Sequence, residues 1–197
     1  MVNKPVAEAC LRNQQPIAEI LQQYLGDQRC LLEIGSGTGQ HAVYCAERLP
    51  QLQWQPTELA GNIAGIDLWR RDAGLDNILP PLILDLDQPW PQVAADNIFT
   101  ANTVHFVSQA SVDNLFAQAG QRLPVKGLLM IYGPFNQGHQ YTSEGNRGLD
   151  QWLKTSVNPQ AGIKDIGDIT TLAAVNNLTL IARHTMPANN LMLVFRR

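Results

Sequence analysis

The sequence of 197 residues has no long apolar run and few charged side chains. A membrane-spanning helix needs about 20 consecutive apolar residues, so none is expected here. The first residues, Met1–Pro5, lack the apolar core of a signal peptide. Together these absences lead us to expect a cytoplasmic protein without a membrane partner.

Cysteine and charge are also scarce, and each scarcity excludes a class of protein. Cys10, Cys30 and Cys45 cannot all pair with one another and show no C-x-x-C spacing, and the four histidines add no metal-ligand spacing. We therefore expect no metal site, and we expect Cys30 and Cys45 to be core thiols in a reducing compartment. Charged residues make up 16% of the chain and the net charge is −3. No basic stripe is present, so nucleic acid is not the expected partner.

The most informative stretch that is present runs from Leu31 to Gly39. A short apolar segment ends in an acid and then in three glycines at alternate positions, Glu33-Ile34-Gly35-Ser36-Gly37-Thr38-Gly39. This pattern predicts a buried strand that breaks into a tight turn before a helix. Because glycines carry no side chain, a flat polar ligand can lie directly on such a turn.

The spacing of these glycines argues against two common phosphate-binding turns. The dinucleotide fingerprint G-x-G-x-x-G/A, counted from Gly35, ends on Gln40, which is neither glycine nor alanine. No Lys-Ser or Lys-Thr follows, so a P-loop is excluded as well. The carboxylate of Glu33 would repel a pyrophosphate, whereas it would attract an ammonium or sulfonium group.

The pattern E-x-G-x-G-x-G after a first strand resembles motif I of the class I S-adenosylmethionine-dependent methyltransferases. Over nearly its whole length the chain is most similar to the DUF938 / methyltransferase-like protein 26 family. The segments that carry this resemblance are Arg12-Asn13 with Pro16, Gln55-Pro56-Thr57-Glu58, and Asn102-Thr103-Val104-His105. The resemblance implies S-adenosylmethionine as cofactor and S-adenosylhomocysteine as product, and it leaves the methyl acceptor open.

Hydrophobic periodicity predicts an α/β fold in which strands and helices alternate. Apolar runs predict strands over 29–34, 52–56, 82–86, 98–101, 127–132, 178–184 and 190–195. Helices are predicted between them, with Asn13, Ser111 and Asp168 as N-caps. The alternation favours a parallel sheet with helices on both faces, and the short link between the last two strands favours an antiparallel hairpin. The resemblance implies a Rossmann-like, doubly wound sheet of seven strands, mostly parallel with an antiparallel final strand.

The chain length suits a single domain over residues 1–197. Within it we expect an N-terminal helical segment, 1–27. Residues 133–167 interrupt the alternation and are rich in Gly, Asn and Gln, with a short helical signal near Leu149 and Trp152. Long connections of this kind are often binding lids, so a lid or insertion is predicted there.

Polar groups follow four predicted strands, and ligands of open α/β sheets bind at those ends. Glu58 can accept both ribose hydroxyls, Asp85 can accept an adenine amino group, and a carbonyl near Ala101 can accept an ammonium. Each acid also has a simpler explanation: Glu33 as a salt-bridge partner, Glu58 as a helix cap, Asp85 as a turn residue. The predicted cofactor-binding residues are Glu33, Gly35, Ser36, Gly37, Gly39, Glu58, Leu59, Asp85, Leu86, Ala101 and Asn102.

The substrate is much less defined by the sequence. Methyl transfer depends mainly on alignment and needs a base only when the acceptor must lose a proton early. His105 and Tyr132 are candidates for catalysis, and His105 is slightly better explained as a structural histidine bonded to a backbone carbonyl. The Asn-Pro-Pro-Tyr type of motif that acts on bases and glutamines is absent. Candidate residues of the acceptor pocket are Arg12, Asn13, Asn136, His139, Tyr141 and Glu144.

Three functions remain open at this point. The first is a methyltransferase that acts on a small molecule or a protein side chain. The second is a non-catalytic module that binds S-adenosylmethionine and regulates a partner. The third, a nicotinamide-dependent reductase, is disfavoured by Gln40 and by the lack of a clear Tyr-x-x-x-Lys pair. Nothing in the sequence predicts the oligomeric state.

Overall fold

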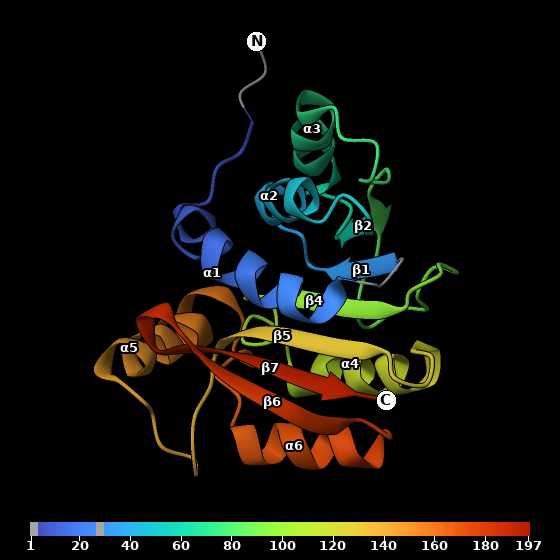
Figure 1. The fold of residues 1–197 in the computed structure, drawn as a ribbon. Helices are drawn as coiled ribbons and strands as arrows, with labels where there is room; N and C mark the ends of the chain where they lie inside the picture. The colour runs from blue at the N-terminus through green and yellow to red at the C-terminus, as the bar shows by residue number, and fades with distance from the viewer. Residues whose placement is uncertain (1–3, 27–29) are drawn as a thin grey trace. The chain divides into compact units, whose positions relative to one another are not determined.

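A computed structural model describes residues 4–26 and 30–197 of the chain. Its seven strands form one sheet in the order β3-β2-β1-β4-β5-β7-β6 (Figure 1). Strands β1, β2 and β3 pair in parallel, whereas β7 pairs antiparallel with both β5 and β6. The predicted fold class is therefore confirmed: a mostly parallel, Rossmann-like sheet with an antiparallel final strand.

Contacts divide the chain into two compact units, Met1–Phe99 and Thr100–Arg197. The described residues of the first unit form three helices and three strands: α1 (Glu8–Leu25), β1 (Cys30–Ile34), α2 (Gln40–Arg48), β2 (Gln53–Glu58), α3 (Ile63–Ala73) and β3 (Leu82–Ile83). Strand β4 (Asn97–Ala101) lies across the boundary. The prediction of a single domain over residues 1–197 stays a prediction.

The second unit contains the remaining elements. They are α4 (Gln109–Arg122), β5 (Leu128–Pro134), α5 (Glu144–Trp152), a π-helical turn (Leu153–Val157), α6 (Ile166–Val175), β6 (Thr179–Met186), a 3₁₀ turn (Pro187–Asn189) and β7 (Asn190–Arg196). Residues 133–167 are thus not an irregular loop, because α5 and the π-helical turn occupy their middle. The predicted hairpin of the last two strands is present, with Met186 opposite Asn190.

Each unit is built around its own apolar contacts. In the first, α1 packs on α2 and α2 on α3, and the ring of Trp54 lies edge-on to Phe99 with centroids 6.1 Å apart. In the second, α4 packs on α6, and Phe116 lies edge-on to Phe195 at 5.5 Å. These four aromatic side chains are fully buried, and burial of such a side chain contributes about 1.5–3 kcal/mol.

Several predicted boundaries are wrong, and at the start of α1 the reason is a contact that the sequence does not reveal. Asn13 does not cap α1, because the helix begins at Glu8, where the N–H of Ala7 donates to the Gln40 side chain at 2.6 Å. Strand β3 spans only Leu82–Ile83 instead of residues 82–86. The start of the first predicted strand, residue 29, lies outside the described residues.

Two predicted N-caps, Ser111 and Asp168, lie about one turn after the residues that cap these helices in the structure. The cap of α4 is Ser108, whose hydroxyl accepts a hydrogen bond from Ser111 N at 3.0 Å. The cap of α6 is Asp165, whose carboxylate accepts from Gly167 N at 2.8 Å, and Asp168 lies in the first turn. In both cases two capping residues stand three apart, and only one can precede the helix.

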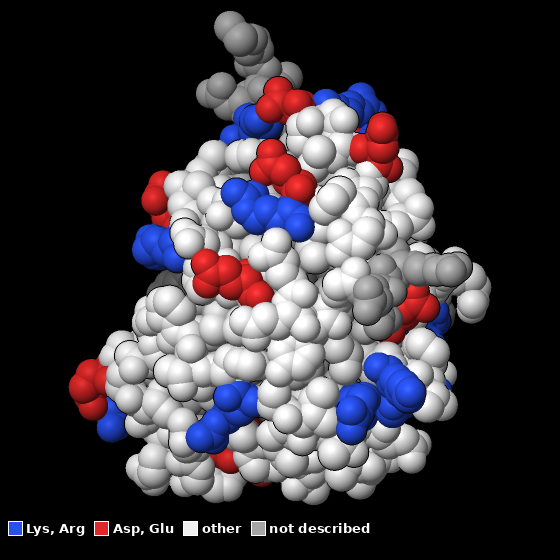
Figure 2. Space-filling model, in the orientation of Figure 1, with Lys and Arg blue, Asp and Glu red and all other residues white. Residues whose placement is uncertain are grey.

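Three further predictions concern membrane helices, the distribution of surface charge and the burial of the cysteines. In the described part of the chain, no helix combines the length and apolar character that crossing a bilayer requires. On the face drawn in Figure 2, basic and acidic side chains are interspersed and neither sign gathers into a patch. Cys45 is a buried thiol as predicted, whereas Cys30 is only half-buried because it lies at the start of β1.

Candidate functional site

The glycine turn joins β1 to α2, as its sequence predicts. Gly35, Gly37 and Gly39 have φ values of +70°, +57° and +91°, a region that side chains other than glycine rarely adopt. A Cβ on Gly39 would lie 3.0 Å from the Cα of Ile66, so α3 packs directly on the turn there. A Cβ on Gly37 would meet nothing within 4 Å. The turn therefore has open space above its centre.

Glu58, at the end of β2, is attached to this turn. Its Oε2 accepts a hydrogen bond from Gly37 N and its Oε1 accepts one from Leu59 N, both at 2.8 Å. Ser36 N also donates to the carbonyl of Thr57 at 2.9 Å. Because a carboxylate oxygen has more than one acceptor position, Glu58 keeps capacity for further donors. The structure thus brings together the predicted ribose acceptor and the predicted turn.

Glu33 lies beneath the turn and is only 1% exposed. Its Oε2 accepts hydrogen bonds from Ser36 Oγ and Trp54 Nε1, both at 2.8 Å. Burial raises the pKa of Glu33 to about 7, a rise that the two hydrogen bonds oppose and the charge of Glu58 reinforces. The salt-bridge explanation fails in the described structure, because both donors are neutral. Glu33 instead connects the turn to β2.

Gln40, the first residue of α2, is a feature that sequence reasoning missed. It is 3% exposed, and its Oε1 accepts from Ala7 N at 2.6 Å and from Thr38 Oγ1 at 2.9 Å. Since Ala7 N can only donate, the amide orientation is fixed and Nε2 is a genuine donor. Among the described residues nothing accepts from this buried Nε2. The N-terminus of α2 has no side-chain cap either, so donors converge there.

Residues of α1 complete the surroundings of the turn. Asn13 is buried, and its Oδ1 accepts from His41 Nε2 at 2.7 Å, while His41 Nδ1 lies 3.8 Å from Cys10 Sγ. Burial lowers the pKa of His41 to about 4 and raises the pKa of the Cys10 thiol, so both groups are neutral near pH 7. Asn13 is therefore part of a packed contact between helices, whereas Arg12 is exposed.

The third predicted acid follows the short strand β3. Asp85 is half-buried, and its Oδ1 accepts from Asp87 N at 2.9 Å, while its carbonyl accepts from Gln88 N at 3.1 Å. This is the turn geometry that the simpler explanation describes. Leu86 is 8% exposed and Leu59 is 51% exposed. Their predicted roles beside a nucleoside stay predictions.

The second unit carries the predicted residues that follow β4. Ala101 ends this strand, and Asn102 adopts a φ of +57° while its N–H donates to the carbonyl of Tyr132 at 2.9 Å. Both candidates for catalysis are buried: His105 is 5% exposed and Tyr132 is 2% exposed. Burial, aided by the charge of Lys164, lowers the pKa of His105 to about 4. His105 is accordingly neutral near pH 7.

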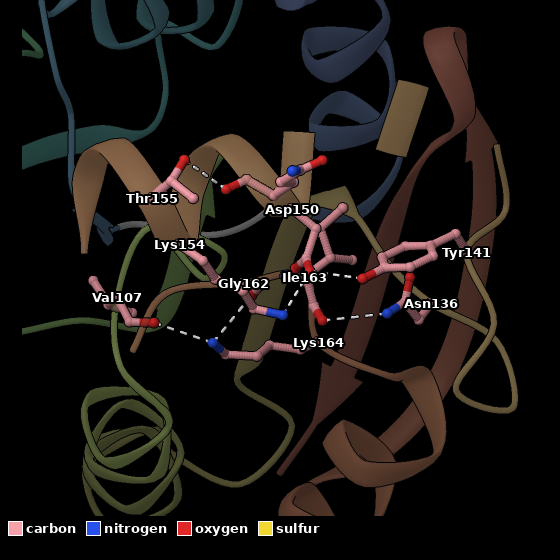
Figure 3. Close-up of polar contacts among 10 residues, drawn as sticks. Val107, Asn136, Tyr141, Asp150, Lys154, Thr155, Gly162, Ile163 and Lys164 are labelled. Atoms are coloured by element: carbon pink, nitrogen blue, oxygen red, sulfur yellow. Dashed lines mark hydrogen bonds and ion pairs between the residues drawn. The ribbon is translucent and has the colours of Figure 1, made fainter. Parts of the chain in front are cut away.

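The four pocket candidates of the second unit do not form one group. Asn136 and His139 line a cavity of about 200 Å³. The hydroxyl of Tyr141 instead donates to the buried Asp150 at 2.7 Å (Figure 3). Glu144 is exposed in the first turn of α5, where it pairs with Arg147 at 3.3 Å.

Asp150 was not predicted, although it organises residues 133–167. It also accepts from Lys154 Nζ at 2.6 Å and from Ile163 N at 2.7 Å (Figure 3). Burial alone would raise the pKa of this carboxyl, but the hydrogen bonds from Lys154, Tyr141 and Ile163 hold it below its usual value. A charged residue in a sequence segment of mixed character gives no signal of such burial.

Comparison with known proteins places this geometry in a wider context. The profile of a family described as "Protein of unknown function (DUF938)" matches residues 4–197. Among solved structures, an O-methyltransferase family protein from Burkholderia thailandensis is similar with a TM-score of 0.83 at 14% identity, over 96% of this chain and 57% of that one.

Two further structures share the fold. An O-methyltransferase family 2 protein from Planctomyces limnophilus, in complex with apigenin, has a TM-score of 0.82 at 16% identity, over 93% of this chain and 56% of that one. Human N-acetylserotonin methyltransferase, in complex with SAM, has a TM-score of 0.76 at 11% identity, over 93% and 54%. The chain thus spans little more than half the length of these proteins, and identities this low establish a common fold.

Proposed function

The chain belongs to the DUF938 family of proteins of unknown function, and we propose that it binds S-adenosylmethionine and transfers the methyl group to a small molecule or a protein side chain. The observation that carries this proposal is the open glycine turn with Glu58 bound to its centre. An adenosyl ligand on this turn would place its ribose hydroxyls against Glu58, where the carboxylate has acceptor capacity left.

Gln40 and the N-terminus of α2 extend the same proposal. Within the described residues, nothing accepts from the buried Nε2 of Gln40, and no side chain caps the N-terminus of α2. A carboxylate is the natural partner of donors of this kind. The carboxylate of the cofactor's methionine moiety supplies one. The predicted adenine contact at Asp85 and Leu86 and the ammonium contact at Ala101 and Asn102 belong to the same proposal. Glu33 supports the turn from below.

The reaction itself is an in-line displacement. The bound cofactor would supply a methyl group on a sulfonium, which a lone pair of the acceptor would take while the electron pair of the carbon–sulfur bond returned to sulfur. The protein contributes mainly by holding acceptor and methyl group in line. His105, neutral near pH 7, is able to accept a proton where the acceptor must lose one.

A second function is favoured by one specific observation. His105 and Tyr132 are both buried, so neither is poised at an open surface. This supports the alternative of a regulatory module that binds the cofactor without turnover. One experiment separates the methyltransferase from the regulatory module. The protein is incubated with S-adenosylmethionine and cell extract, and mass spectrometry measures whether S-adenosylhomocysteine is formed. Stable binding without release in fractionated extracts favours the module.

Calorimetry tests the cofactor directly. We expect S-adenosylmethionine and S-adenosylhomocysteine to bind with micromolar dissociation constants and NADH not to bind. Binding of NADH alone would overturn the assignment.

A matched pair of variants locates the site. Gly37→Val and Gly74→Val introduce the same side chain at φ values of +57° and +62°, and neither Cβ meets an atom within 4 Å. Both should lose similar stability, about 1–2 kcal/mol. Only Gly37→Val should abolish binding of S-adenosylhomocysteine in calorimetry, because its side chain fills the space above the turn. Equal affinity in the two variants would remove the turn from the site.

A further inference from the structure

Three side chains of the second unit form a cluster with the composition of a metal site. His139 lies in the loop after β5, Asp165 caps α6, and Asp168 lies in the first turn of α6. One potential ligand atom from each lies within 4.8 Å of the others, and His139 Nδ1 is 3.8 Å from Asp168 Oδ2. One imidazole and two carboxylates are donors that divalent transition metals accept.

Asn136, which lines the same cavity, carries a buried side-chain oxygen without a donor among the described residues. Asn136 and the three clustered residues line one cavity of about 200 Å³. The Oδ1 atom of Asn136 is buried, and within the described part of the chain no donor reaches it, while Nδ2 faces the carbonyl of Ile163 at 3.4 Å. An amide oxygen without a donor is unfavourable in a protein interior. A metal ion, or a water bound to one, would satisfy it.

Asp165 is oriented in the way that metal ligands usually are. Its Oδ2 accepts from His139 N at 2.6 Å and its Oδ1 accepts from Gly167 N at 2.8 Å. Both donors are backbone groups, so the carboxylate is held in place, and each oxygen keeps a second acceptor position. Hydrogen bonds of this kind fix the direction of a ligand before the ion arrives.

The positive charges near the cavity do not oppose a cation strongly. Lys164 lines the cavity, but its Nζ donates to the carbonyls of Val107 at 3.1 Å and Gly162 at 3.0 Å (Figure 3). The N-terminus of α6 carries a partial positive charge, and the two carboxylates outweigh it.

We propose that His139, Asp165 and Asp168, in the cavity that Asn136 also lines, bind a divalent transition-metal ion of the zinc type. Ligand atoms roughly 2.0–2.2 Å from an ion are at most about 4.4 Å apart, so the cluster must contract slightly on binding. His139 and Asp168 are 73% and 67% exposed, which leaves both free to move. This site is independent of the cofactor proposal, because none of its residues belongs to the glycine turn.

Titration calorimetry of the chelator-treated full chain with ZnCl₂ tests the site, with MnCl₂ and MgCl₂ as comparisons. We expect one Zn²⁺ per chain, weaker binding of Mn²⁺, and the weakest binding of Mg²⁺, which has little affinity for imidazole. His139→Ala and Asp168→Asn should each lower the Zn²⁺ affinity by about tenfold or more. Glu144→Gln removes an exposed acid of the same segment outside the cavity and should leave the affinity unchanged.

The Zn²⁺ titrations have outcomes that would overturn the proposed metal site. Absence of Zn²⁺ binding to the unaltered chain overturns the proposal, and so does unchanged affinity in both His139→Ala and Asp168→Asn. Both altered side chains are at the surface, and circular dichroism of each variant confirms that it is folded. Binding of S-adenosylhomocysteine, measured on the same samples, should not change in the two variants. A failure of the metal site is therefore distinguishable from a failure of the cofactor site.

Discussion

At the scale of single residues, buried polar groups carry most of the chemistry of the glycine turn. Glu33 is removed from water and accepts hydrogen bonds from Ser36 and Trp54 instead. Its burial raises its pKa, because these neutral donors do not fully replace the lost hydration of the carboxylate. Gln40 leaves one donor unpaired in the same region. Unfavourable groups of this kind are expected where a ligand completes the structure.

The raised pKa of Glu33 predicts a specific pH dependence of stability. The unfolded chain loses this proton near its ordinary pKa of 4.5, whereas the folded chain loses it only near 7. The free energy of unfolding therefore falls as pH rises between these values, by about 3 kcal/mol at roughly 1.4 kcal/mol per pKa unit. Glu33→Gln keeps an oxygen for both donors and removes the titration, so its stability should fall less between pH 5 and pH 8.

Urea unfolding at the two pH values checks this result. Glu47→Gln, which changes an acid that is 64% exposed, should keep the pH dependence of the unaltered chain. A parallel decline in Glu33→Gln and Glu47→Gln would show that Glu33 is already ionised in the folded protein at pH 5.

At the scale of elements, the strands and their order follow from the sequence more fully than the helix ends do. Strand β1 and strand β5 are apolar runs that have no other plausible location than a buried sheet. The caps of α4 and α6 were each placed three residues late, because two equivalent capping residues are present and only tertiary packing selects one. The local sequence does not distinguish the two candidate capping residues of each helix.

The same distinction explains which site residues were predictable. The glycine turn is local, so its sequence reveals it. The cluster of His139, Asp165 and Asp168 joins residues more than twenty positions apart, and a search for regular metal-ligand spacing cannot find it. The buried state of Asp150 and the unpaired Nε2 of Gln40 likewise depend on segments that meet only after folding.

In the segment 133–167, we expect the loss of a single carboxylate to lower the stability of the folded chain strongly. Asp150 of α5 accepts hydrogen bonds from Tyr141, Ile163 and Lys154, so Asp150→Ala removes the acceptor of three donors. We expect a loss of about 3 kcal/mol in the free energy of unfolding at pH 7, measured with urea. Because the pKa of Asp150 is held below its usual value, this contribution is present above that value and disappears as pH falls below it.

Lys154→Ala is the matched control for this prediction. It removes a partner of the same carboxylate, but the lysine side chain is 51% exposed, so the loss should stay below about 1 kcal/mol. Equal losses in Asp150→Ala and Lys154→Ala would show that the ion pair, and not the network of hydrogen bonds, stabilises the segment.

At the scale of the whole molecule, the residues predicted to hold the cofactor are concentrated in one part of the chain. Nine of them, from Glu33 to Leu86, belong to the unit Met1–Phe99, and only Ala101 and Asn102 fall beyond it. A ligand that binds the folded chain stabilises it in proportion to the logarithm of its concentration relative to its dissociation constant. Thermal unfolding of the entire chain therefore reports on the cofactor proposal without any assumption about the acceptor.

We predict that S-adenosylhomocysteine at 100 times its dissociation constant stabilises the chain by about 2.7 kcal/mol. For a protein of this size the melting temperature then rises by roughly 5–10 °C. Adenosine and methionine, each added alone at the same concentration, should give smaller shifts, because each would occupy only part of the proposed site. Adenosine would contact Glu58, Asp85 and Leu86, and methionine would contact the donors of Gln40 and α2 and the end of β4 at Ala101 and Asn102. Scanning fluorimetry measures all three. A shift with NADH as large as that with S-adenosylhomocysteine would contradict the proposed ligand. It would mean that the turn, with the Glu58 carboxylate beside it, binds a pyrophosphate.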